Sequence, residues 1–170
     1  MSLNAPPGPP TPEKRAASVR AALARGDLLG AYDEVARRGD TSHPELNYLE
    51  VLTLARLGDT ERALRLYEDY GLADLGDVDT LSLKARLLKD LAFAAGPTPN
   101  RKRLLEACDL YEAVHQRTQS SYPAINAASL ALIAGKTDLA ERLAQEVVRE
   151  TAPERRSGYF SLATLAEALV

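Results

Sequence analysis

The sequence predicts an all-α protein, an α-solenoid of about four and a half helical hairpins, or about nine helices. Three observations carry this prediction. Apolar residues recur at helical spacing between glycines and prolines, and no segment shows the strict apolar–polar alternation of a half-buried strand. The helical segments are short and are joined by short turns, as in hairpins of antiparallel helices. One small-residue pattern returns at successive turns, which indicates a repeat.

The expected elements follow in order from the amino terminus. Residues 1–11 are rich in proline and are expected to form a disordered leader, and residues 12–170 form the helical repeat domain. The expected helices are 12–25, 28–38, 44–57, 60–70, 79–95, 101–118, 122–134, 138–150 and 154–170. Glycines stand near the ends of most of these helices, where a left-handed C-terminal cap favours glycine. They are Gly26, Gly39, Gly58, Gly71, Gly96 and Gly135.

The repeat is a glycine, then four residues, an alanine, three residues and a larger apolar residue. Its copies are Gly26–Ala31–Val35, Gly58–Ala63–Tyr67 and, with a smaller last member, Gly135–Ala140–Ala144. A fourth copy, Ala107–Tyr111, lacks a nearby glycine. The four alanines are separated by 32, 44 and 33 residues, which resembles the tetratricopeptide repeat with its period of about 34. The alternative, an irregular bundle with alanines recurring by chance, is disfavoured by four copies in near-constant register.

The alanine of the repeat is expected where the second helix of a hairpin crosses the first. Only a small side chain lets two helices approach closely, so Ala63 and Ala140 are expected to be nearly fully buried. Small residues midway along first helices, Ala85 and Ala128, fit the other side of such contacts. The whole pattern predicts a helix content above roughly 70%.

Three stretches between residues 80 and 170 support a narrower resemblance. They are Ala85 to Asp90 (ARLLKD), Ser121 to Ala128 (SYPAINAA) and Tyr159 to Ala168 (YFSLATLAEA). This half resembles the tetratricopeptide-like TRAFs-binding region of the apoptosis signal-regulating kinases and its bacterial relatives. The resemblance implies a regulatory scaffold beside a signalling or effector domain, and in the kinases such regions bind adaptor proteins.

Composition excludes several classes of function. The net charge of −3 and the isoelectric point near 5.5 offer no excess of positive charge for nucleic acid. The apolar stretches fall short of the ~20 residues that a membrane span needs. The amino terminus has no secretory signal pattern, so we expect a cytoplasmic protein with no membrane partner.

Few residues suggest chemistry. Glu112 and His115 share a helix with Cys108, the single cysteine, but His115 follows Cys108 by seven positions, which span about 10 Å, too far for a nucleophile and its base. His43 lies beside Pro44 in an expected turn, at the surface. We therefore expect no enzyme and no catalytic, cofactor-binding or metal-binding residues.

The first helix of each stacked hairpin lines a concave face, and this face is the expected binding groove. Its mixture of cations, an amide and apolar groups suits an extended peptide. The candidate residues are Arg20, Tyr48, Leu52, Arg56, Arg86, Lys89, Asn126 and Ser129. Arg86, Lys89 and Asn126 are expected on one shared surface.

The leading hypothesis for function is a scaffold that binds a protein or peptide through this groove. A second hypothesis is homodimerisation through the last helix, 154–170, whose apolar residues occupy too wide an arc for one neighbour to cover. The third is an enzyme or a sensor of a small ligand.

Overall fold

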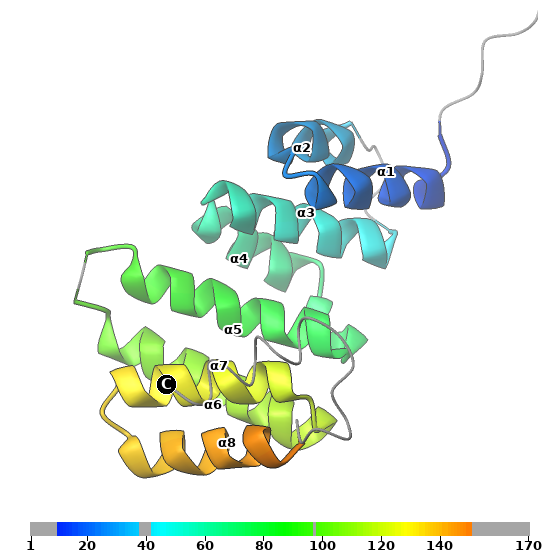
Figure 1. The fold of residues 1–170 in the computed structure, drawn as a ribbon. Helices are drawn as coiled ribbons and strands as arrows, with labels where there is room; N and C mark the ends of the chain where they lie inside the picture. Colours follow the sequence, from blue (N-terminus) through cyan, green and yellow to red (C-terminus); the bar gives the residue numbers. More distant parts are fainter. Residues whose placement is uncertain (1–9, 38–41, 97, 151–170) are drawn as a thin grey trace, which may run out of the picture. The chain divides into compact units, whose positions relative to one another are not determined.

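The computed structural model describes residues 10–37, 42–96 and 98–150 (Figure 1). These residues contain eight α-helices and one short 3-10 helix but no strand, and 82% of them are helical. The prediction of an all-α fold made of helical hairpins is thereby confirmed. The expected leader up to residue 9 and the expected ninth helix, 154–170, with its partly uncovered apolar face, lie outside the described residues.

The described contacts divide the chain into two compact units, Met1–Leu72 and Ala73–Val170. The first unit holds two hairpins, α1 (Pro12–Ala24) with α2 (Leu28–Ala36) and α3 (Pro44–Leu57) with α4 (Thr60–Asp69). Besides these pairs, α3 packs against both α1 and α2. The 3-10 helix η1 (Leu72–Leu75) follows α4.

The second unit contains α5 (Val78–Phe93), α6 (Arg101–Thr118), α7 (Ser121–Ile133) and α8 (Thr137–Glu150). Each helix packs against the next along the chain, so α6 lies against both α5 and α7. Within each unit, the first helix of one hairpin contacts the first helix of the other hairpin to a different extent. In the first unit α1 packs against α3, whereas α5 and α7 make little direct contact.

The repeat alanines lie at the helix contacts, as predicted. Ala31, Ala63 and Ala107 are completely buried, and Ala140 exposes only 7% of its surface. The described turn glycines Gly26, Gly58, Gly71, Gly96 and Gly135 all have positive φ, as predicted, and Gly39 lies outside the described residues. Gly58 ends α3 with φ of 85°, a left-handed conformation that side chains disfavour, although a Cβ at this position would meet no atom within 4 Å.

The larger members of the repeat fill the core. Val35, Tyr67 and Tyr111 are all buried, each one helical turn after its alanine. Small and large residues thus alternate along the second helices, which is how neighbouring helices interlock at native packing density.

Candidate partner-binding surface

The two arginine candidates of the first unit tie α1 to α3. An Arg20 Nη2 lies 2.8 Å from Glu45 Oε1, and this ion pair crosses from α1 to α3. Arg56, two turns further along α3 than Tyr48, donates from Nη1 to the Leu23 carbonyl at 3.3 Å, near the end of α1. Both guanidinium groups therefore already have acceptors within their own unit.

The remaining candidates of this unit serve its core. Tyr48 and Leu52 are partly buried and pack against a cluster of apolar residues from α1, α2 and α3. The candidates on α3 recur every four residues, so they form one row, and this row packs beside α1. The sequence predicts these residues as part of a binding groove, and that role stays a prediction. In the structure this row of residues holds two first helices together.

The cationic candidates on α5 lie further from their acceptor than Arg20 does from Glu45. Arg86 Nε lies 3.6 Å from Asp90 Oδ2, and Lys89 Nζ lies 3.5 Å from Asp90 Oδ1. One carboxylate therefore serves two cations, at distances longer than the 2.7–2.9 Å typical of a charge-assisted hydrogen bond. About a third of each of the three side chains is exposed.

The candidates on α7 bond to their own helix. The Asn126 amide donates to the Tyr122 carbonyl at 2.9 Å, and the Ser129 hydroxyl donates to the Ile125 carbonyl at the same distance. Neither side chain joins α7 to a neighbouring helix through these bonds. The Tyr122 side chain, one turn before Asn126, is about half exposed.

Tyr111 of α6 lies beside the first turn of α7. Its ring meets the ring of Tyr122 edge to face, with centroids 6.4 Å apart and planes at 85°. Burial, reinforced by the nearby Tyr122, raises the pKa of Tyr111, while the charge of Arg86 acts in the opposite direction and that of Asp90 in the same one. The Tyr111 ring of α6 thus contacts the amino-terminal turn of α7.

The Tyr111 hydroxyl is buried without a hydrogen-bond partner among the described residues. Tyr122 is near enough to oppose its ionisation, but the pair does not have hydrogen-bond geometry. Sequence reasoning recognised Tyr111 only as a packing residue of the repeat. The available signal was that Tyr111 holds the repeat position that Val35 and Ala144 hold in other copies. A buried tyrosine normally has a partner for its hydroxyl, so a polar residue at this position could have been singled out.

The residues considered for catalysis are engaged elsewhere. Cys108 is completely buried, its sulfur lies 3.5 Å from the Ala127 carbonyl, and burial raises the pKa of the thiol. His115 is also buried, with Nδ1 2.9 Å from the Ser120 carbonyl and Nε2 3.3 Å from Glu146 Oε2. The histidine thus links the end of α6 to α8 and makes no pair with the cysteine. His43 is the N-cap of α3, where its Nδ1 accepts from the Leu46 N–H at 3.4 Å.

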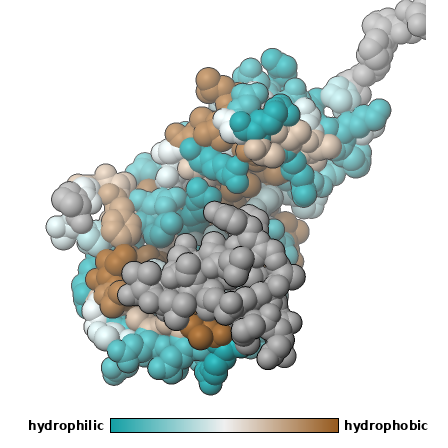
Figure 2. All heavy atoms as spheres, in the orientation of Figure 1, coloured by the Kyte–Doolittle hydropathy of each residue, from teal (hydrophilic) through white to brown (hydrophobic). Residues whose placement is uncertain are grey.

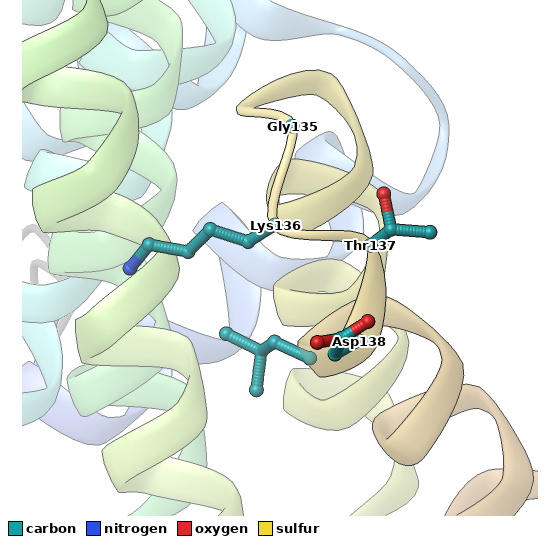
Figure 3. Close-up of a pocket in the computed structure, with 5 residues that line it drawn as sticks. Gly135, Lys136, Thr137 and Asp138 are labelled. Carbon is teal, nitrogen blue, oxygen red and sulfur yellow. The ribbon is translucent and has the colours of Figure 1, made fainter.

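A hollow of about 400 Å³ lies at the turn between α7 and α8 and is lined by residues 135–139 (Figure 3). Lys136 extends away from Thr137 in this view, and its Nζ pairs with Asp109 of α6 at 3.3 Å. The polar side chains therefore diverge, whereas an active site needs groups that converge on a reacting atom. Throughout residues 10–37, 42–96 and 98–150, no group of three or more acidic, histidine or cysteine side chains is placed to hold a metal ion.

Hydrophilic residues predominate among the coloured atoms of Figure 2, with some hydrophobic patches between them. In the described residues the last turn of α7 exposes Leu132 and Ile133 by 62% and 53%. No helix in the described part of the chain is long and apolar enough to cross a membrane.

Comparison with known proteins agrees with this architecture. The family model described as Tetratricopeptide Repeats-Sensor, TPR-S, matches residues 26–132, which is more than half of the chain. The comparison with curated proteins found no match, and neither did the comparison with solved structures. Tetratricopeptide-like repeats generally mediate protein–protein interactions, and this type of repeat is typically a scaffold without enzymatic activity. With hairpins, repeat alanines and family match in agreement, the chain belongs to the Tetratricopeptide Repeats-Sensor family.

Proposed function

We propose that this protein is a non-catalytic scaffold that binds a protein or peptide partner through the surface formed by α5 and α7. The observation that carries the proposal is a difference between the two units in the acceptors that their candidate cations contact. Arg20 and Arg56 connect α1 to α3, whereas among the described residues Arg86 and Lys89 both pair with the Asp90 carboxylate, at 3.6 and 3.5 Å. The second surface therefore keeps hydrogen-bonding capacity for a partner.

The geometry of this surface suits an extended peptide. Arg86, Lys89 and Asn126 offer donors at partly exposed positions, and Tyr122 adds a half-exposed aromatic ring. Tyrosine and arginine are enriched among the residues that dominate binding energy at protein interfaces. A rigid helical framework also presents these groups at little cost in conformational entropy.

The resemblance to the TRAFs-binding region points to the biological setting. It supports a regulatory scaffold that works beside a signalling effector in the cytoplasm and has an adaptor-like protein as its partner. The word "sensor" in the family description fits a module whose bound partner regulates an effector. The chain carries a net charge of −3, which supports a protein partner over nucleic acid.

The experiment is a selection of displayed random peptides on the purified chain, followed by calorimetric titration of the selected peptides. Arg86→Ala and Asn126→Ala remove donors from the proposed surface, and Arg20→Ala alters the other unit as the matched control. We expect weaker binding for the first two variants and little change for the third. If no peptide is selected, or if all three variants bind as the wild type does, the proposed function is wrong.

A further inference from the structure

We propose that the second unit carries a further binding site at the edge where three of its helix ends meet, and that this site binds an acidic amphipathic helix of a protein partner. We call it the apolar–basic edge. It consists of Phe93, Leu132 and Ile133 together with Lys102 and Arg103. None of these five residues is among those proposed to bind through the α5–α7 surface, so the inference adds a second site to the chain.

Two hydrogen bonds bring the three helix ends together. The Asn100 N–H donates to the Ala92 carbonyl at 2.7 Å, which holds the start of α6 at the end of α5. Arg101 donates from Nη1 to the Ala134 carbonyl at 2.9 Å, which connects the same turn of α6 to the end of α7. The carbonyls of a last helical turn have no acceptor role within their own helix, so both bonds meet a need of the fold. The side chains beside them therefore lie along one edge of the second unit.

Large apolar side chains are exposed at this edge. Leu132 and Ile133 expose 62% and 53% of their surface, and Phe93 exposes 37%. Inside α7, by contrast, Ile125 and Leu130 expose only 3% each. Figure 2 shows hydrophobic residues at the left of the view, on the side where α7 ends in Figure 1. Apolar groups that gather in this way commonly mark an interaction site, because their burial against a partner is favourable.

The start of α6 gives the edge a positive charge. Arg101, Lys102 and Arg103 are consecutive and all exposed. Arg101 keeps its charge while it bonds to a neutral carbonyl, and no carboxylate among the described residues forms an ion pair with Lys102 or Arg103. Glu106, which is exposed one turn further along α6, is the acidic side chain nearest in sequence. The amino-terminal end of the helix adds a positive partial charge. The edge therefore attracts acidic groups, although the whole chain has a net charge of −3.

The combination of apolar and basic groups indicates the chemistry of the partner. An amphipathic helix can bury its apolar face against Leu132 and Ile133 while acidic side chains beside that face approach Lys102 and Arg103. A second copy of the chain fits less well, because two such edges in contact would bring like charges together. A membrane surface also fits less well, since interfacial binding scales with buried apolar area and three side chains form a small face.

The probe for the test is a fluorescein-labelled synthetic helix with leucines along one face and glutamates beside them. It is titrated with the full chain and followed by fluorescence anisotropy. One comparison peptide has lysine in place of every glutamate, and another has the same composition with its leucines spread around the helix. We expect the acidic amphipathic peptide to bind at least about tenfold more tightly than either comparison peptide. Added salt should weaken its binding, because the charges lie at the surface.

Variants at exposed positions test the edge without disturbing the core. Leu132→Asn and Ile133→Asn should each weaken the acidic amphipathic peptide by about tenfold. The double variant Lys102→Gln with Arg103→Gln should weaken it by a similar factor and should also reduce the dependence on salt. The matched control is Leu29→Asn in the first unit, where Leu29 is 72% exposed, and it should leave binding unchanged. Circular dichroism and the urea midpoint check that each variant is folded.

The outcomes separate this inference from the proposed function. Equal affinity of the three peptides, or equal affinity of the Leu132→Asn and Leu29→Asn variants, would overturn the apolar–basic edge. A probe that depends on Arg86 but not on Leu132 would belong to the α5–α7 surface, which would overturn the edge and leave the proposed function in place. Vesicles with phosphatidylserine that bind through Leu132 while the acidic peptide does not would assign the edge to a membrane. A dimer that Leu132→Asn dissolves, seen by light scattering without peptide binding, would assign it to a second copy. Either of these two results would overturn the inference.

Discussion

Replacing Ala63 with leucine tests whether the repeat register explains the fold. Ala63 lies in α4 with no exposed surface, in the hairpin that α4 forms with α3. The larger side chain must be accommodated by displaced neighbours, because the methyl group already fills its space. Overpacking of this kind typically costs about 1–3 kcal/mol. The structure therefore predicts a clear loss of stability from one exchange of apolar residues with similar helix propensity.

The assay is urea denaturation followed by circular dichroism, and we expect an unchanged slope because one substitution hardly alters the surface exposed on unfolding. Ala140→Leu makes the equivalent change in the second unit, where Ala140 is 7% exposed. The matched control is Ala17→Leu, at an exposed position of α1, for which we expect a change within about 0.5 kcal/mol. Wild-type midpoints for both Ala63→Leu and Ala140→Leu would show that these alanines are not helix-crossing residues.

Two further predictions concern single groups. The Cys108 thiol should react with a maleimide at least about a hundredfold more slowly in the native protein than in urea, because burial shields it and raises its pKa; rapid native labelling would contradict its placement in the core. Asp77→Ala should destabilise by about 1 kcal/mol, since Asp77 accepts from the Thr80 N–H at 2.9 Å as the N-cap of α5. Burial acts to raise the pKa of Asp77, but hydrogen bonds from Thr80 outweigh it and leave the pKa lowered. The stabilisation that depends on the Asp77 charge is therefore fully present above the ordinary aspartate pKa and is lost as the pH falls through the lowered pKa of Asp77. An Asp77→Asn variant whose stability depends on acid pH in the same way as that of the wild type would refute this.

The helices could be predicted because their signals are local. Proline at the first position of α3 and glycine at its end fix this helix at Pro44–Leu57, which are the predicted bounds. Helix ends were predicted less well where such signals are weaker. The helix predicted at 28–38 ends at Ala36 as α2, and the one predicted at 79–95 is α5, Val78–Phe93. Such shifts are expected because the terminal turns lack a full set of backbone hydrogen bonds.

The use of each groove candidate could not be predicted from spacing alone. Helical periodicity gives the face on which Arg56 or Arg86 lies, but it does not give the distance to the next first helix. In the structure Arg56 donates to the Leu23 carbonyl of α1, while among the described residues Arg86 pairs with Asp90 of its own helix. The number of free donors on a surface is a property of the packing between helices, and it appears only when the neighbouring helix is in place.

The spacing between first helices accounts for this difference. In the first unit α1 and α3 pack directly, so long polar side chains on α3 meet acceptors on α1. In the second unit α5 and α7 make little direct contact, and the Tyr111 ring of α6 contacts Tyr122 of α7. Among the described residues, Arg86 and Lys89 of α5 pair with Asp90 of their own helix and with no acceptor on α7. The distance between first helices therefore determines which polar side chains remain for the proposed partner.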